Sequence, residues 1–177
     1  PEIGCYRKLF KDKVVWIEAN PNTYENKTKV VASRNNQECY NFAAYNTDDE
    51  ELTLHIPVRE DISSLYLSEE FPPVRTTQIK TKKLDTLFLE ETLDINNFDF
   101  LNIDVEGAEL KVLEGFKDNL DKINSIFIEV STASRFIGSE ATLETIHNYL
   151  IEKGFGLADI SSSMQTLGWG DAFYIRQ

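Results

Sequence analysis

Three short apolar runs in the chain each end in a carboxylate. They are residues 14–18 (VVWIE), 98–104 (FDFLNID) and 125–129 (SIFIE). β-Branched and aromatic residues fill the runs, so each is predicted to be a strand. Helix-like sequence follows two of them, the pattern of a parallel sheet covered by helices. Because ligands of such sheets bind beyond the carboxyl ends of the strands, we expect Glu18, Asp104 and Glu129 to mark a site.

The rest of the pattern predicts a succession of short elements. Helices are expected over residues 1–11, from Asn20 or Asn22 to 34, 84–91, 108–119 and, capped by Ser139, 140–153. Strands are expected over residues 38–45, 51–56, 76–83, 155–160 and 172–175, and a loop over 57–73. This order predicts an α/β sandwich with a mostly parallel sheet and an antiparallel C-terminal edge strand. A fold of this kind that opens with a helix lacks the strand that should precede it.

Length and charge limit the classes of protein. A chain of 177 residues is the size of one domain, which we assign to residues 1–177. Its net charge of -12 argues against nucleic acid as a partner, because phosphate binding needs a basic face. No apolar stretch approaches the ~20 residues of a membrane span, and no secretory leader is visible, so a cytoplasmic protein is expected. Cys5 and Cys39 make neither a metal-ligand spacing nor a disulfide framework.

Residues 103–110 (IDVEGAEL) carry the densest chemistry. Asp104 ends a strand, Gly107 permits a tight turn, and a helix begins at once. Glu106 and Glu109 lie near the positive end of that helix, where acids are stabilised. Helix capping accounts for one of these acids but not for three within six residues, which favours a functional site. Glu18 fits two interpretations, a ribose-binding acid at the end of a second strand or an exposed strand-end acid.

The segment IDVEGAEL followed by KVLEGF resembles the signature of the FkbM-type methyltransferases, which use S-adenosylmethionine. The resemblance extends over most of the chain, in matching order, through residues 14–21, 41–44, 48–54, 63–64 and 81–87. It implies a Rossmann-like methyltransferase fold, S-adenosylmethionine as cofactor, and O-methylation of a hydroxyl on a small molecule or sugar.

The resemblance also implies roles for the donor side of the site. Glu18 would bind the ribose of the methyl donor. Asn41, Ala43 and Ala44 would lie near the adenine, where small residues leave room for a flat ring. Asp104 would stand near the sulfonium.

For the acceptor side, the resemblance implies that Asp104 and Glu106 stand beside the hydroxyl to be methylated. Asp104 is then the first candidate for the catalytic base and Glu106 the second. Ser63 and Ser64 would lie on a loop over the site, and Glu129 could face the acceptor.

One departure from the family concerns the front of the domain. The family carries a Gly-rich turn of the form Asp-Val-Gly-Ala after its first strand, whereas this sequence starts inside or just before the helix that follows. We therefore expect the domain to be N-terminally incomplete, with a gap between the strands that end at Glu18 and Asp104.

Two other functions stay open. A nicotinamide-dependent oxidoreductase or epimerase would also use an acid after strand two, but it would usually add a Tyr-x-x-x-Lys pair, and Tyr149 and Lys153 lie at a helix end far from the acidic segments. A non-catalytic module that keeps the fold is the third interpretation. Hard divalent ions favour carboxylates, yet no His or Cys supports zinc, so no metal is expected. Trp169 is either a loop aromatic that contacts substrate or a packing residue.

Overall fold

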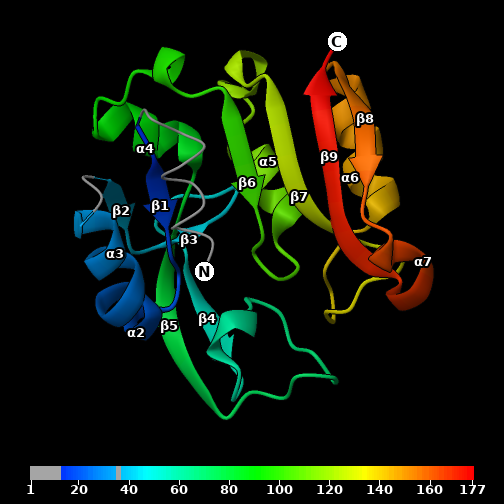
Figure 1. Cartoon of the computed structure of the whole chain (residues 1–177). Coiled ribbons are helices and arrows are strands. Elements are labelled where there is room, and N and C mark those ends of the chain that lie inside the picture. Colours follow the sequence, from blue (N-terminus) through cyan, green and yellow to red (C-terminus); the bar gives the residue numbers. More distant parts are fainter. Residues whose placement is uncertain (1–12, 35–36) are drawn as a thin grey trace.

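The computed structural model describes residues 13–34 and 37–177 as a mixed α/β fold (Figure 1). The strands are β1 (Val15–Ile17), β2 (Glu38–Tyr40), β3 (Ala43–Ala44), β4 (Glu51–Ile56), β5 (Arg75–Lys82), β6 (Phe100–Ile103), β7 (Ser125–Ser131), β8 (Phe155–Ile160) and β9 (Trp169–Arg176). The helices are α2 (Pro21–Thr23), α3 (Lys29–Arg34), α4 (Leu84–Glu90), α5 (Glu109–Glu114), α6 (Leu143–Glu152) and α7 (Ser163–Leu167). A π-helical turn covers Tyr24–Thr28, and 3₁₀ turns cover Glu60–Ile62, Ile95–Asn97 and Leu120–Lys122. The helix expected over residues 1–11 lies outside the described residues.

The strands form three hydrogen-bonded groups. β1 pairs in parallel with β2, and β5 lies between its parallel partner β3 and its antiparallel partner β4. β6 and β7 are parallel, and β9 and then β8 continue that sheet in antiparallel fashion. The expected antiparallel C-terminal edge is confirmed. The expectation of a mostly parallel sheet is wrong for the described strands, because the loop after β4 and the short β8–β9 connection turn the chain back on itself and make half of the pairs antiparallel.

β1 and β6 have few strand neighbours. Among the described strands, β1 is hydrogen-bonded only to β2, and β6 only to β7. Ile17 of β1 nevertheless packs against the same core as Ile103 of β6. The expected gap between the strands that end at Glu18 and Asp104, and the strand that would fill it, remain predictions.

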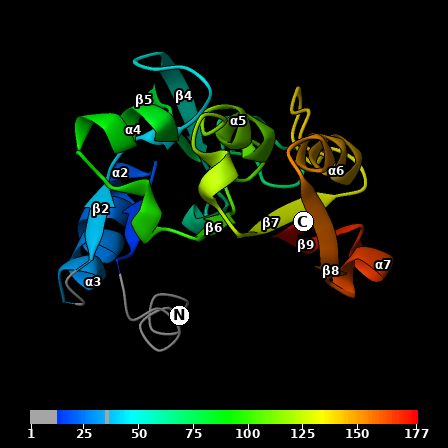
Figure 2. The ribbon, with the colours of Figure 1, turned by 90° about the horizontal axis from the view of Figure 1, so that it is seen from above.

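The main hydrophobic core lies between the β6–β7–β9–β8 sheet and helices α5 and α6, which cover one face of that sheet (Figure 2). Along β7, Ile126 and Ile128 are fully buried and alternate with the outward-facing Phe127 and Glu129. Ile146 and Leu150, one turn apart on α6, are also fully buried in this core. Each such side chain contributes roughly 1.5–3 kcal/mol of burial free energy.

Two helices differ in length from the sequence prediction. α5 ends at Glu114 rather than near 119, and Gly115 is its C-cap. A Cβ atom on Gly115 would lie 1.9 Å from the carbonyl oxygen of Tyr45, so only a glycine permits this approach. α6 begins after Thr142, whose side chain forms a capping box with Thr145. The expected cap, Ser139, instead donates its hydroxyl to the carbonyl oxygen of Gly107.

Two strand boundaries also differ. The single strand expected over residues 38–45 is divided between β2 and β3, which belong to different sheets, and Phe42 between them packs against Leu87 and Leu93. The last strand starts at Trp169, earlier than expected, because residues 169–171 pair with residues 129–131 of β7. None of the helices over residues 13–34 and 37–177 combines the length and the apolarity that a bilayer crossing demands.

Candidate functional site

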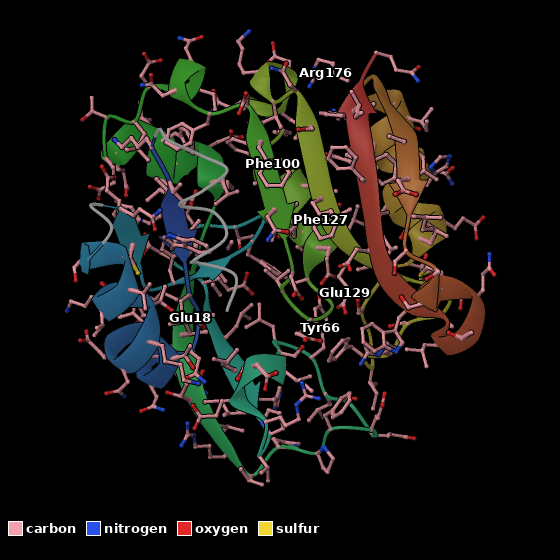
Figure 3. All side chains as sticks on the ribbon, in the orientation of Figure 1. Glu18, Tyr66, Phe100, Phe127, Glu129 and Arg176 are labelled. Atoms are coloured by element: carbon pink, nitrogen blue, oxygen red, sulfur yellow. The ribbon has the colours of Figure 1, made fainter. Side chains whose placement is uncertain are left out.

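The acids that end the three apolar runs lie at the carboxyl ends of their strands. Glu18 follows β1, Asp104 follows β6, and Glu129 lies in the second half of β7. Figure 3 shows Glu18 and Glu129 at a similar height, both below Phe100 and Phe127 in that view. Asp104 and Glu129 come close together near the ends of β6 and β7, and a site that they share with Glu18 remains a prediction.

A tight turn joins β6 to α5. Glu106 and Gly107 have φ angles of 54° and 102°, in the left-handed region that a non-glycine residue adopts at a cost of order 1–3 kcal/mol. Glu109, the first residue of α5, is buried, and its carboxylate accepts hydrogen bonds from the backbone amides of Gly107 and Val105. Burial raises the pKa of Glu109 to about 7. Glu109 thus stabilises the turn, so one of the three acids of residues 103–110 has a structural role.

Two loops fix this turn from outside. Ser64 donates its hydroxyl to the carbonyl oxygen of Glu106 at 2.6 Å, and Ser139 donates to the carbonyl oxygen of Gly107, also at 2.6 Å. Ser64 is buried and also accepts from the amide of Tyr66. The hydroxyl of Ser64 is therefore engaged with the backbone beside the acidic rim.

The described residues bring Asp104, Glu106 and Glu129 together. One carboxylate oxygen from each lies within 4.8 Å of the others. Burial, and then the negative charge of Asp104, raises the pKa of Glu106 to about 7. Burial, and then the charges of Glu106 and Asp104, raises the pKa of Glu129 to about 8. Oε2 of Glu106 is buried and has no hydrogen-bond partner among the described residues. We call these three residues the acidic cluster.

The acidic cluster offers three oxygen ligands, the type that Mg²⁺ and Ca²⁺ prefer. No His or Cys belongs to it, so it lacks the nitrogen and sulfur ligands typical of structural zinc sites. The sequence-based expectation that the site works without a metal remains a prediction. The same geometry suits a shared proton, since like charges this close raise one another's pKa.

Arg135 lies beside the acidic cluster and is the site residue that sequence reasoning missed. Its Nη1 is 3.5 Å from Oε1 of Glu129, and its guanidinium stacks 4.5 Å from the centre of the Trp169 ring. Trp169 lies at the start of β9 and packs against Arg135, which agrees with the packing alternative of the two that the sequence left open. Arg135 follows β7 in a segment without helical or strand periodicity, so no pattern in the sequence singles it out.

The other side of the site is built around Glu18. Oε1 of Glu18 accepts from the amide of Asn20 at 2.8 Å, and its Oε2 makes no hydrogen bond among the described residues. Burial raises the pKa of Glu18, and the Asn20 hydrogen bond opposes this effect. Asn41 donates from Nδ2 to the carbonyl oxygens of Glu18 and Ala19. Nearby, Ala43 is buried in β3 and Ala44 is half-buried.

Ser63 and Ser64 connect the two sides. Asn20 caps α2 through its Oδ1 and donates from Nδ2 to the hydroxyl of Ser63 at 3.3 Å, and Ser63 in turn donates to the carbonyl oxygen of Glu60. The neighbouring Ser64 bonds to the Glu106 turn. Consecutive serines thus tie the loop after β4 to both the Glu18 side and the acidic cluster.

Comparison with known proteins identifies the class. The model of the methyltransferase FkbM domain matches residues 5–157. The chain therefore belongs to the FkbM methyltransferase domain family, and the resemblance drawn from its motifs is confirmed. Searches of curated proteins and of solved structures give no match.

Proposed function

We propose that this chain is an S-adenosylmethionine-dependent methyltransferase that methylates a hydroxyl group on a small molecule or sugar. Membership of the FkbM methyltransferase domain family supports the reaction class. The observation that carries the proposal is the convergence of Asp104, Glu106 and Glu129 at the carboxyl ends of β6 and β7, which is where a sheet of this kind receives its ligands.

The residues around Glu18 fit the methyl donor. A ribose offers two hydroxyls, and Oε2 of Glu18 has no partner among the described residues, so it can accept from one of them. Asn41 fixes the backbone at Glu18, and the small side chains of Ala43 and Ala44 leave space for the flat adenine ring. When bound, the donor supplies a methyl group on a positively charged sulfur.

The acidic cluster suits the acceptor. In methyl transfer the acceptor oxygen forms a bond to the methyl carbon as the carbon–sulfur bond breaks, and the hydroxyl proton must pass to a base. Asp104 is exposed at the rim and is our first candidate for that base, with Glu106 second. Glu129 faces both and can hold a second acceptor hydroxyl. Positioning and charge management supply most of the catalysis in such a displacement.

The test of this assignment is the Asp104→Asn variant, with Asp121→Asn as the matched control because Asp121 is exposed and remote from the site. We expect Asp104→Asn to lose turnover while it binds S-adenosylhomocysteine like the parent, and Asp121→Asn to change neither. Unchanged turnover in Asp104→Asn would remove Asp104 from the mechanism. Donor binding is measured by titration calorimetry and turnover by methyl transfer to a panel of hydroxyl compounds.

An oxidoreductase is less well supported. The hydroxyl of Tyr149 donates to the carbonyl oxygen of Leu113, and Lys153 caps α6 with its ammonium over the Tyr149 ring. This pair thus serves the packing of α6 on α5 and is not arranged around a hydride. Calorimetric titration with a nicotinamide dinucleotide and with S-adenosylmethionine separates the two functions, and binding of neither favours a non-catalytic module.

A further inference from the structure

Arg135 is held in a fixed orientation by aromatic rings. Its guanidinium carbon lies 4.5 Å from the ring centre of Trp169, 5.6 Å from that of Phe71 and 5.9 Å from that of Phe136. Its side chain is only 15% exposed. Cation–π stacking of this kind holds the plane of a guanidinium and leaves its N–H edges available to an acceptor.

The described residues give Arg135 ion-pair contacts but no hydrogen bond of normal length. The buried Nε has no hydrogen-bond partner among the described residues. The nearest carboxylate oxygens are Oε2 of Glu70, 3.8 Å from Nε, and Oε1 of Glu129, 3.5 Å from Nη1. Both distances exceed the 2.7–2.9 Å typical of charge-assisted hydrogen bonds. A buried donor in this state is costly until an acceptor approaches it.

Arg135 also lines a cavity. It has a volume of about 270 Å³ and is lined by Glu69, Glu70, Ser134, Arg135, Phe136 and Ile137. The volume is close to the lower end of small-molecule sites. Glu70 is 62% exposed on the loop between β4 and β5, so its carboxylate can leave the guanidinium at little cost.

We propose that Arg135 binds an acidic group of the acceptor, a carboxylate or a phosphate, and that Glu70 occupies this place when no acceptor is bound. Because Arg135 lies 3.5 Å from Glu129, and Glu129 belongs to the acidic cluster, an acid group held by Arg135 places hydroxyls a few bonds away against that cluster. The acceptor class is therefore a hydroxy acid, an acidic sugar or a sugar phosphate. The carboxylates of Glu70 and Glu129 oppose the approach of an anion, so its binding depends on the positive charge of Arg135.

The part of this inference that concerns the methylated hydroxyl rests on the proposed function. The binding of an acidic group by Arg135 does not. The experiment is a calorimetric titration with D-glucuronate, D-glucose 6-phosphate and D-glucose, with and without S-adenosylhomocysteine. We expect at least one of the acids to bind about tenfold or more tightly than glucose, the gain of one charge-assisted pair. Tighter binding of D-glucuronate would indicate a preference for carboxylates, and tighter binding of D-glucose 6-phosphate a preference for phosphates. No saturable binding of either acid would overturn the inference, whereas binding of acid without S-adenosylhomocysteine binding would overturn only the proposed function.

Variants test the role of Arg135 itself. Arg135→Gln is expected to abolish the preference for acids, while Arg75→Gln, the same charge change at an exposed ion pair with Glu60, keeps it. Glu70→Gln removes the competing carboxylate from an exposed position and is expected to tighten acid binding severalfold without affecting glucose. Glu152→Gln, exposed on α6, is its control. The inference would be contradicted if Arg135→Gln preferred acids as strongly as the parent protein. It would also be contradicted if Glu70→Gln bound acids more weakly than the parent.

Discussion

The hydroxyl oxygen of Ser64 and the carbonyl oxygen of Glu106 lie 2.6 Å apart, although the two residues come from different loops. The bond joins the loop after β4 to the strained turn that carries Glu106. Ser64, expected on a loop over the site, donates to the Glu106 carbonyl and accepts from the Tyr66 amide beside the acidic cluster. Its role toward substrate remains a prediction.

Loss of this bond is expected to destabilise the fold. Ser64→Ala leaves the Glu106 carbonyl and the Tyr66 amide without their buried partner, which costs roughly 1–3 kcal/mol of unfolding free energy. Ser33→Ala is the control, since Ser33 is exposed and bonds only within α3. Equilibrium urea unfolding measures both variants. Equal stability of Ser64→Ala and Ser33→Ala would show that the bond does not hold the turn.

Gly107 tests the close packing of the turn. A Cβ atom there would lie 2.8 Å from Cδ2 of Phe136, at a φ of 102°, so Gly107→Ala suffers both a collision and backbone strain. Gly138→Ala isolates the strain, because its φ is 84° but its Cβ meets open space. We expect Gly138→Ala to cost on the order of 1 kcal/mol and Gly107→Ala clearly more. Thermal and urea unfolding of the pair measure the difference, and equal losses would contradict the packing of Phe136 on the turn.

The acidic cluster predicts a pH dependence of stability. The pKa values of Glu106 and Glu129 rise from the ordinary 4.5 to about 7 and about 8 in the folded chain, and that of the buried Glu109 to about 7. Groups with raised pKa values bind protons more tightly when folded, so their stabilising contribution is complete below pH ~4.5 and is lost as pH rises through about 7 to 8. Unfolding free energy should therefore fall from pH ~5 to ~8.

Glutamine variants test whether the acidic cluster causes this pH dependence of stability. In Glu129→Gln and Glu106→Gln one titrating carboxyl is removed and the charge repulsion on its neighbour weakens, so the decline in unfolding free energy between pH ~5 and ~8 should become shallower. Glu152→Gln, exposed on α6, should keep the parent slope. Urea unfolding in chelator-treated buffer at several pH values provides the measurement. If unfolding free energy fell with pH as steeply in both cluster variants as in the parent protein, the carboxyls would not share a common site.

Much of the arrangement follows from local patterns. The alternation of residues 125–131 predicts which side chains of β7 are buried, and the placement of acids at strand ends predicts that Asp104 and Glu129 meet. The start of α6 does not follow, because Ser139 bonds to Gly107, which is distant in sequence, and Thr142 caps the helix instead. Arg135 was missed for the same reason, since its stacking partners Phe71 and Trp169 come from other parts of the chain.

The π-helical turn and the divided strand show a further limit. Of the two asparagines predicted as possible caps, Asn20 begins the helix and accepts from the amides of Asn22 and Thr23. No residue type in the sequence predicts the π-helical turn at Tyr24–Thr28. The residues between β2 and β3 have the pattern of a continuous strand, but β2 pairs with β1 and β3 pairs with β5, which no local pattern predicts.

The central claim is that the residues around Glu18 hold the nucleoside of a methyl donor. Calorimetric titration of S-adenosylhomocysteine into the parent protein and into Glu18→Gln tests this claim most directly. Glu25→Gln is the control, because Glu25 is exposed on the π-helical turn. We predict saturable binding to the parent and to the control. Binding to Glu18→Gln should be weaker by about tenfold or more, the loss of a hydrogen bond from a ribose hydroxyl to a charged carboxylate. Equal affinity in all three proteins, or no binding to the parent, would contradict the account.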